Sequence, residues 1–179
     1  MQWKKRHGVL RSKPRFRKPY RVVLHHTAGG TMSGAVSTLI KRGLGYHYII
    51  NKNGDIHEFV PADRWTAHAY KNNSGTVGVS YVGGGKFGPI NAKQLASLTQ
   101  LLMIIKKDYP TITELSGHKH VDPRGWKSDP MWPGEEPNKN DWAVDRHYME
   151  LLASDTGLEF VCKEDLENEG YVRKIKRFF

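Results

Sequence analysis

The first half of the chain carries short apolar runs separated by turn residues. Val22, Val23 and Leu24 form an apolar run that begins with two β-branched residues, which is typical of a buried strand. Two later runs flank Asn53 and Gly54, a pair that tolerates positive φ and favours a tight hairpin turn. The pattern predicts strands in this half over residues 21–24, 46–50, 56–60 and 76–82.

Apolar residues recur at helical spacing in other segments. The clearest covers residues 91–107, where Asn91 suits the N-cap position. Shorter helices are predicted over residues 33–41, with Ser33 as the cap, and over residues 141–152. A short strand is expected just before Gly117. The order β-α-β-β-β-α-β-α predicts an α/β fold, a single domain whose central mixed β-sheet of about five strands is flanked by helices.

The chain is strongly basic, with a formal net charge of +10. Nine of its 28 Lys and Arg residues lie in the first 21 positions, which contain no acid. We therefore expect residues 1–20 to form a basic N-terminal arm that either stays solvated or contacts a polyanion such as an anionic cell envelope. Residues 21–153 are predicted to form the main domain, and residues 154–179 a C-terminal extension that packs on it or forms a tail.

Composition also argues against several classes of protein. No apolar run approaches the roughly 20 residues needed to span a bilayer, and the N-terminus lacks the apolar region of a secretory signal. The single cysteine, Cys162, excludes an intrachain disulfide and a thiolate-rich zinc finger, and we expect it to be a buried small side chain. No nucleic-acid-binding motif accompanies the basic charge, so no nucleic-acid partner is expected.

Histidine is the side chain that suggests chemistry, because the chain has nine of them. A catalytic zinc takes three protein ligands and keeps a fourth position open. His25 directly follows the first predicted strand, and His118 follows the predicted strand that ends at Gly117. Asp129 lies eleven residues further on, in a loop whose two prolines and glycine could fold it back toward His118. Spacing alone leaves other triplets open, and His120 is a rival third ligand because residues two apart on a strand share a face.

Five motifs follow one another in the chain between about Val22 and Pro130. They are Val-Leu-His-His-Thr-Ala-Gly at residues 23–29, Gly-Tyr-His-Tyr-Ile-Ile at 45–50, Ala-His-Ala with Asn-Asn at 67–73, Thr-Val-Gly-Val at 76–79, and Gly-His with Lys-Ser-Asp-Pro at 117–130. In this order they resemble the type-2 N-acetylmuramoyl-L-alanine amidases, a family related to peptidoglycan recognition proteins and to phage amidase lysozymes. The fold implied is the α/β fold of that family.

The resemblance implies one zinc ion per chain, held by His25, His118 and Asp129. It also implies two catalytic residues. Tyr46 is expected to position the attacking water or help deprotonate it. Lys127 is expected to stabilise the negative charge that develops on the carbonyl oxygen.

The Ala-His-Ala and Asn-Asn segment corresponds to the substrate cleft of the family. The resemblance therefore implies substrate-binding roles for His68 and Asn73. Trp65, just before this segment, is expected to flank the glycan.

These roles imply a hydrolase that cleaves the amide bond between N-acetylmuramic acid and L-alanine of peptidoglycan, with residues 21–153 as its catalytic domain. A single domain with a basic arm and no recognisable wall-binding repeat resembles a phage endolysin. We expect a monomer made in the host cytoplasm, which reaches the wall after release through another factor. Two alternatives stay open: a bacterial cell-wall recycling amidase, and a module that binds peptidoglycan without cutting it.

Overall fold

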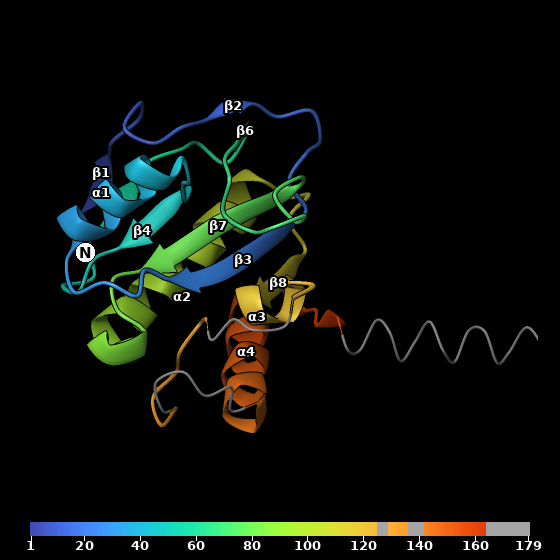
Figure 1. Cartoon of the computed structure of the whole chain (residues 1–179). Coiled ribbons are helices and arrows are strands. Elements are labelled where there is room, and N and C mark those ends of the chain that lie inside the picture. Colours follow the sequence, from blue (N-terminus) through green and yellow to red (C-terminus); the bar gives the residue numbers. More distant parts are fainter. Residues whose placement is uncertain (125–128, 136–141, 164–179) are drawn as a thin grey trace, which may run out of the picture.

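The computed structural model describes residues 1–124, 129–135 and 142–163, and a seven-stranded β-sheet forms the centre of this part of the chain (Figure 1). Across the sheet the strands follow the order β1-β5-β4-β7-β3-β8-β9. Their bounds are β1 (Trp3–Lys5), β3 (Arg21–His26), β4 (Tyr48–Ile50), β5 (Ile56–Glu58), β7 (Thr76–Tyr81), β8 (Glu114–Gly117) and β9 (Glu159–Phe160). The predicted mixed sheet is confirmed, and it has more strands than the five expected.

The middle of the sheet is parallel. β7 pairs in parallel with β4 and β3, and β3 pairs in parallel with β8. β5 runs antiparallel to β4, and the turn between them contains Gly54 at a φ of 87°, as the hairpin pattern predicted. The carboxyl ends of neighbouring parallel strands meet at one edge of a sheet, which is where open α/β sheets bind ligands. The ends of β3 and β8 meet in this way.

Helices cover both faces of the sheet. α2 (Ala92–Asp108) and α4 (Trp142–Thr156) pack on the face that carries the larger apolar core, which includes Leu24 and Ile50. α1 (Met32–Arg42) packs with a second core on the other face, which includes Ile49. Ile49 and Ile50 separate in this way because successive strand residues point to opposite faces. Among the residues that the structure describes, we find no helix with both the length and the apolar content of a membrane span.

Local capping chemistry sets the start of two helices. Asn91 caps α2 as predicted: its side chain accepts the Gln94 N–H, while the Gln94 side chain accepts the Asn91 N–H, forming a capping box. The cap of α1 is Thr31 rather than the predicted Ser33, because the hydroxyl oxygen of Thr31 accepts the Gly34 N–H. The helix therefore begins one residue earlier than the pattern predicted.

The N-terminal residues differ from the solvated arm considered above. β1 pairs in parallel with β5, and the ammonium of Lys4 lies 2.8 Å from the Asp55 carboxylate. A second short strand, β2 (Lys13–Pro14), pairs antiparallel with β6 (Arg64–Trp65) in a separate two-stranded sheet. The basic charge suggested that this segment is solvated, but the backbone of residues 3–5 pairs with β5 and adds a strand to the sheet.

The C-terminal boundary expected at residue 154 falls inside a helix. α4 continues to Thr156, and β9 then pairs in parallel with β8 at the edge of the sheet. Cys162 is buried, as expected for a small apolar side chain. Residues 164–179, the rest of the expected extension, lie outside the described residues.

Candidate metal centre

The carboxyl ends of β3 and β8 bring the first two predicted ligands together. The register pairs Leu24 with Gly117, so the residues that follow them, His25 and His118, stand side by side. Leu24 belongs to the larger apolar core, and alternation along the strand turns His25 to the opposite face. At His118 the chain leaves β8 and enters the short helix α3 (His118–Val121). The Nδ1 atoms of the two histidines are 3.1 Å apart.

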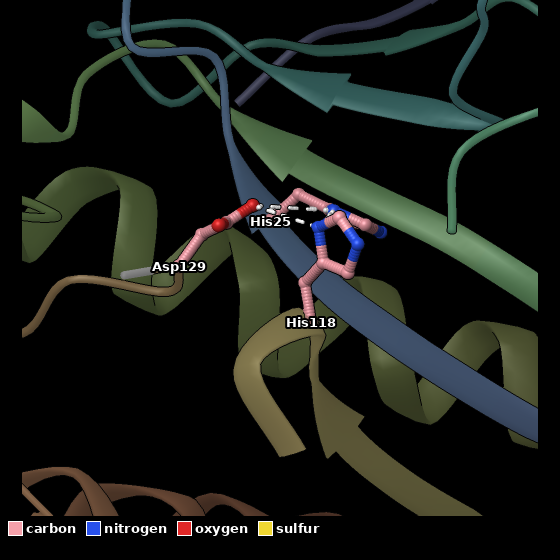
Figure 2. Close-up of side chains that lie close together, drawn as sticks. All are labelled: His25, His118 and Asp129. Atoms are coloured by element: carbon pink, nitrogen blue, oxygen red, sulfur yellow. Dashed lines mark hydrogen bonds and ion pairs between the residues drawn. The ribbon is translucent and has the colours of Figure 1, made fainter. Parts of the chain in front are cut away.

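Asp129 completes a triangle of side-chain atoms with these two histidines (Figure 2). Its Oδ2 lies 3.3 Å from His25 Nδ1 and 3.3 Å from His118 Nδ1. The backbone carbonyl of Asp129 accepts a hydrogen bond from the Lys119 N–H at 3.1 Å, which ties the loop to the start of α3. All three side chains are buried. Asp129 therefore lies next to His118, as predicted.

The triangle has the dimensions of three ligands around a tetrahedral ion. Zinc bonds of about 2.0–2.2 Å to nitrogen and oxygen place neighbouring ligand atoms of a tetrahedron about 3.3 to 3.5 Å apart. The observed separations of 3.1, 3.3 and 3.3 Å are close to this spacing. Two imidazoles and one carboxylate also form a donor set of the kind that catalytic zinc uses, with a fourth position left for water or substrate. The residues therefore fit a zinc ion.

Electrostatics favours the protonation states that bind a metal. Burial, followed by the neighbouring His118, lowers the pKa of His25 to about 4. Burial opposes the ionisation of Asp129, but the neighbouring His118 and His25 side chains lower the pKa of its carboxyl well below the usual range. A neutral imidazole and an ionised carboxylate are the forms that ligate metals. At neutral pH these two groups are thus ready to bind.

In both histidines, the ring nitrogen that faces away from the triangle lies near a polar side-chain atom. His118 Nε2 lies 3.3 Å from the Oδ2 of Asp122, and His25 Nε2 lies 3.1 Å from the Nδ1 of His68. Such partners orient imidazole ligands. Asp122 was not among the predicted site residues, although its position four residues after His118 is a usable signal for a neighbour on a helix.

His120 is engaged elsewhere and does not replace Asp129. Its Nδ1 accepts the Gly117 N–H at 2.9 Å, and its Nε2 lies 2.5 Å from the Oδ2 of Asp145 in α4. The rivalry was expected because residues two apart on a strand share a face. The chain instead turns into α3 after Gly117, and residues two apart on a helix point in different directions.

Tyr46 lies beside the triangle, with its ring centroid 4.9 Å from that of His25. Burial raises the pKa of the Tyr46 hydroxyl above its usual range. At neutral pH the group is therefore a phenol, which can donate a hydrogen bond but does not act as a phenolate base. Lys127, the other predicted catalytic residue, lies outside the described residues, and its role stays a prediction.

The three predicted substrate-binding residues occupy different places. His68 is buried next to His25. The side-chain oxygen of Asn73 accepts the N–H groups of His68 and Ala69, both at 2.7 Å, so Asn73 shapes the loop that carries His68. Trp65 lies in β6, where the ammonium of Lys13 is 4.3 Å from its ring centroid. Their substrate-binding roles stay predictions.

The mixed sheet and the buried His-His-Asp triangle define an α/β domain of the amidase type. A model of the family described as N-acetylmuramoyl-L-alanine amidase matches residues 15–132, well over half of the chain. The chain belongs to this family, as the ordered motifs predicted.

Individual relatives agree with this membership. Peptidoglycan-recognition protein SD of Drosophila simulans is 29% identical over 131 residues, which cover 64% of this chain and 67% of that protein. The solved structure of the endolysin N-acetylmuramoyl-L-alanine amidase LysCS from Clostridium intestinale URNW is similar at 25% identity and a TM-score of 0.57, over 67% of this chain and 84% of that one. The amidase LysC of the same organism shares the fold, with a TM-score of 0.65 and 22% identity over 87% of this chain and 99% of that one.

Proposed function

We propose that the protein is a zinc-dependent amidase that hydrolyses the bond between N-acetylmuramic acid and L-alanine in peptidoglycan. The observation that carries this proposal is the triangle of His25 Nδ1, His118 Nδ1 and Asp129 Oδ2, with sides of 3.1 to 3.3 Å. Membership of the amidase family supports the choice of bond. Similarity to a protein named for peptidoglycan recognition supports the choice of substrate.

The chemistry divides between the metal and the chain. When bound, zinc supplies Lewis-acid chemistry, which polarises a carbonyl and makes water nucleophilic near neutral pH. Tyr46, as a neutral phenol beside His25, donates a hydrogen bond that orients the attacking water. Lys127, two residues before Asp129 in the sequence, stabilises the negative charge that develops on the carbonyl oxygen.

A peptidoglycan-binding module without activity is the second candidate, because one relative is named for recognition rather than cleavage. The complete His25–His118–Asp129 set favours catalysis, since a binding module needs no set of metal ligands.

We further propose a phage endolysin that acts on the cell wall, in preference to a recycling amidase. The similarity to an endolysin amidase at 25% identity supports this choice.

Digestion of purified peptidoglycan followed by mass spectrometry tests the proposal. The wild-type protein should release stem peptides with a free L-alanine amino group and leave glycan strands without peptide. Addition of a chelator should stop the release, and zinc should restore it. The His118→Ala variant should be inactive, whereas His147→Ala, which removes an exposed histidine of α4, should retain full activity.

Each outcome decides between the candidates. Intact glycan–peptide linkages, with protein that sediments together with peptidoglycan, would establish the binding module. Full activity of His118→Ala would show that the metal site is wrongly assigned.

A further inference from the structure

We propose that His68 is a positioning residue that acts through His25. A hydrogen-bonded chain from His25 through His68 to Thr76 fixes the tautomer of His25, so that the lone pair of its Nδ1 faces the metal position. The distances are 3.1 Å from His25 Nε2 to His68 Nδ1 and 3.2 Å from His68 Nε2 to the Thr76 hydroxyl oxygen. The inference rests on the metal site proposed above.

The donor-to-acceptor direction of these hydrogen bonds follows from the last residue of the series, Thr76. The Thr76 hydroxyl makes a short hydrogen bond to the backbone carbonyl of Asn72. A carbonyl oxygen only accepts, so the single proton of the hydroxyl goes to Asn72. Toward His68 the hydroxyl oxygen can therefore only accept, and His68 must carry its proton on Nε2.

The same reasoning extends to His25. His68 is buried, and burial disfavours the charged imidazolium, so its ring carries one proton. With that proton on Nε2, the Nδ1 of His68 accepts, and His25 donates from its own Nε2. A neutral His25 protonated at Nε2 has a free lone pair on Nδ1, the atom in the triangle with His118 and Asp129. The backbone carbonyl of Asn72 thus determines which nitrogen of His25 is available to a metal.

Gly78 leaves the space that the His68 ring needs to make these hydrogen bonds. Thr76 and Gly78 lie two residues apart on β7, so they share a face of the strand. A Cβ atom at Gly78 would lie 2.6 Å from Cγ of His68, a distance that real side chains do not reach. The His68 ring therefore packs over bare backbone, and the Asn73 side-chain oxygen holds the backbone N–H of His68. These contacts indicate that His68 orients the metal-binding ring of His25 and does not bind substrate.

Nitrogen NMR of the histidine rings tests the direction of the hydrogen bonds between His25, His68 and Thr76 in the unmodified protein. Long-range ¹H–¹⁵N spectra of ¹⁵N-labelled protein report which ring nitrogen carries the proton. We expect His68 to be protonated at Nε2 and His25 at Nε2, both with zinc and after its removal. A proton on Nδ1 of His68, or zinc bound through Nε2 of His25, would overturn the proposal.

A pair of substitutions at Thr76 tests the consequence for metal affinity. Thr76→Val keeps the shape of the side chain but removes the hydroxyl acceptor. We expect the zinc dissociation constant, measured by competition with a chromophoric chelator, to rise about tenfold, because partners of metal-bound histidines typically contribute 10- to 100-fold. As the matched control, Thr76→Ser retains the hydroxyl, and its zinc affinity should stay within about twofold of that of the wild type.

These readouts separate the inference from the proposed function. Zinc affinity and ring protonation do not depend on turnover, so a protein that binds zinc without cleaving peptidoglycan would still test the chain. If the protein bound no zinc, the proposed function would fail, and the spectrum of the zinc-free protein would still decide the His68 tautomer. Unchanged zinc affinity and an unchanged spectrum in a folded Thr76→Val protein would refute the role of His68.

Discussion

Two buried polar clusters meet at the short helix α3, and they differ in how they accommodate charge. The first is the metal triangle of His25, His118 and Asp129. The second, here called the ion-pair cluster, ties α3 to α4 and to the segment before it. It consists of Lys119, His120, Trp132, Glu135 and Asp145.

The ion-pair cluster pairs each acid with a basic side chain. The Lys119 ammonium lies 3.0 Å from both the Glu135 and the Asp145 carboxylates, and His120 lies 2.5 Å from Asp145. The Trp132 indole N–H donates to Asp145 at 2.7 Å. Every buried acid thus faces a donor, which is what a buried charge requires.

The metal triangle instead turns three ligand atoms toward one another. His25 Nδ1, His118 Nδ1 and Asp129 Oδ2 converge, and a lone pair on each can satisfy a cation placed between them. Buried histidine and aspartate occur in both clusters, so residue type does not identify the metal site. Convergence of three acceptor atoms on one point distinguishes the triangle as the candidate site.

The largest effect should follow from removal of the single carboxylate of the triangle, that of Asp129. Asp129→Asn keeps the shape of the side chain but replaces the ionised ligand with a weaker neutral one. We expect loss of bound zinc and a fall in amidase activity of about a thousandfold or more, equivalent to roughly 4 kcal/mol of transition-state stabilisation. Zinc analysis and peptide release measure the two losses. Folding measured in chelator should be close to that of the wild type, and retention of zinc would contradict the assignment.

The reciprocal change in the ion-pair cluster should affect stability instead. Asp145→Ala removes the buried carboxylate that pairs with Lys119 and His120. Breaking a buried pair on one side costs about 3 to 5 kcal/mol, so the free energy of unfolding in denaturant should fall by that amount. The folded fraction should still bind one zinc per chain. If Asp145→Ala lost zinc without losing stability, the separation of the two clusters would be wrong.

Acid should weaken the fold through a histidine outside both clusters. Burial lowers the pKa of His47 to about 3 from an unfolded value of 6.5, and its ring donates to the Arg64 carbonyl and accepts from the Gly78 N–H. Between these pKa values the unfolded chain binds more protons, so stability is full above about pH 6.5 and declines as the pH falls. The decline attributable to His47 should reach about 3 kcal/mol by pH 4.

Denaturant titrations at several pH values measure this slope, and His47→Asn provides the comparison. The variant keeps an acceptor toward Gly78 but does not titrate, so its stability should depend less on pH over the same range. Equal slopes for the two proteins would exclude His47 as the source.

The smallest effect should come from a cap far from both clusters. Asn91→Ala removes the side chain that accepts the Gln94 N–H at the start of α2. A lost N-cap costs about 1 kcal/mol, with no expected change in zinc content. Thermal unfolding measures this loss, and a change in metal binding would show that remote destabilisation alone disturbs the triangle.

Features encoded by neighbouring residues were predictable from the sequence. The start of α2 rests on Asn91 and Gln94, three residues apart, and the hairpin rests on Asn53 and Gly54. The grouping of His25 and His118 was predictable because both residues follow predicted strands. The resemblance to the amidase family selected these residues from the other possible triplets.

Features that depend on distant partners were not predictable. Two of residues 3–5, Lys4 and Lys5, are basic, and the segment forms a strand only because β5, some fifty residues later, offers an edge. His120 was expected as a rival ligand because the strand was expected to continue, and its actual partner, Asp145, lies on a helix whose packing the sequence does not reveal. The role of His68 depends on the absence of a side chain at Gly78 and on a backbone carbonyl at Asn72. Neither leaves a pattern in the spacing of residues.

The most direct test of the account is anomalous diffraction at the zinc absorption edge from crystals of the zinc-loaded protein. We predict one anomalous peak per chain, about 2.0–2.2 Å from His25 Nδ1, His118 Nδ1 and Asp129 Oδ2. A peak ligated by His120 or His68, or no peak at the triangle in zinc-loaded crystals, would contradict the central claim that these three atoms form the metal site.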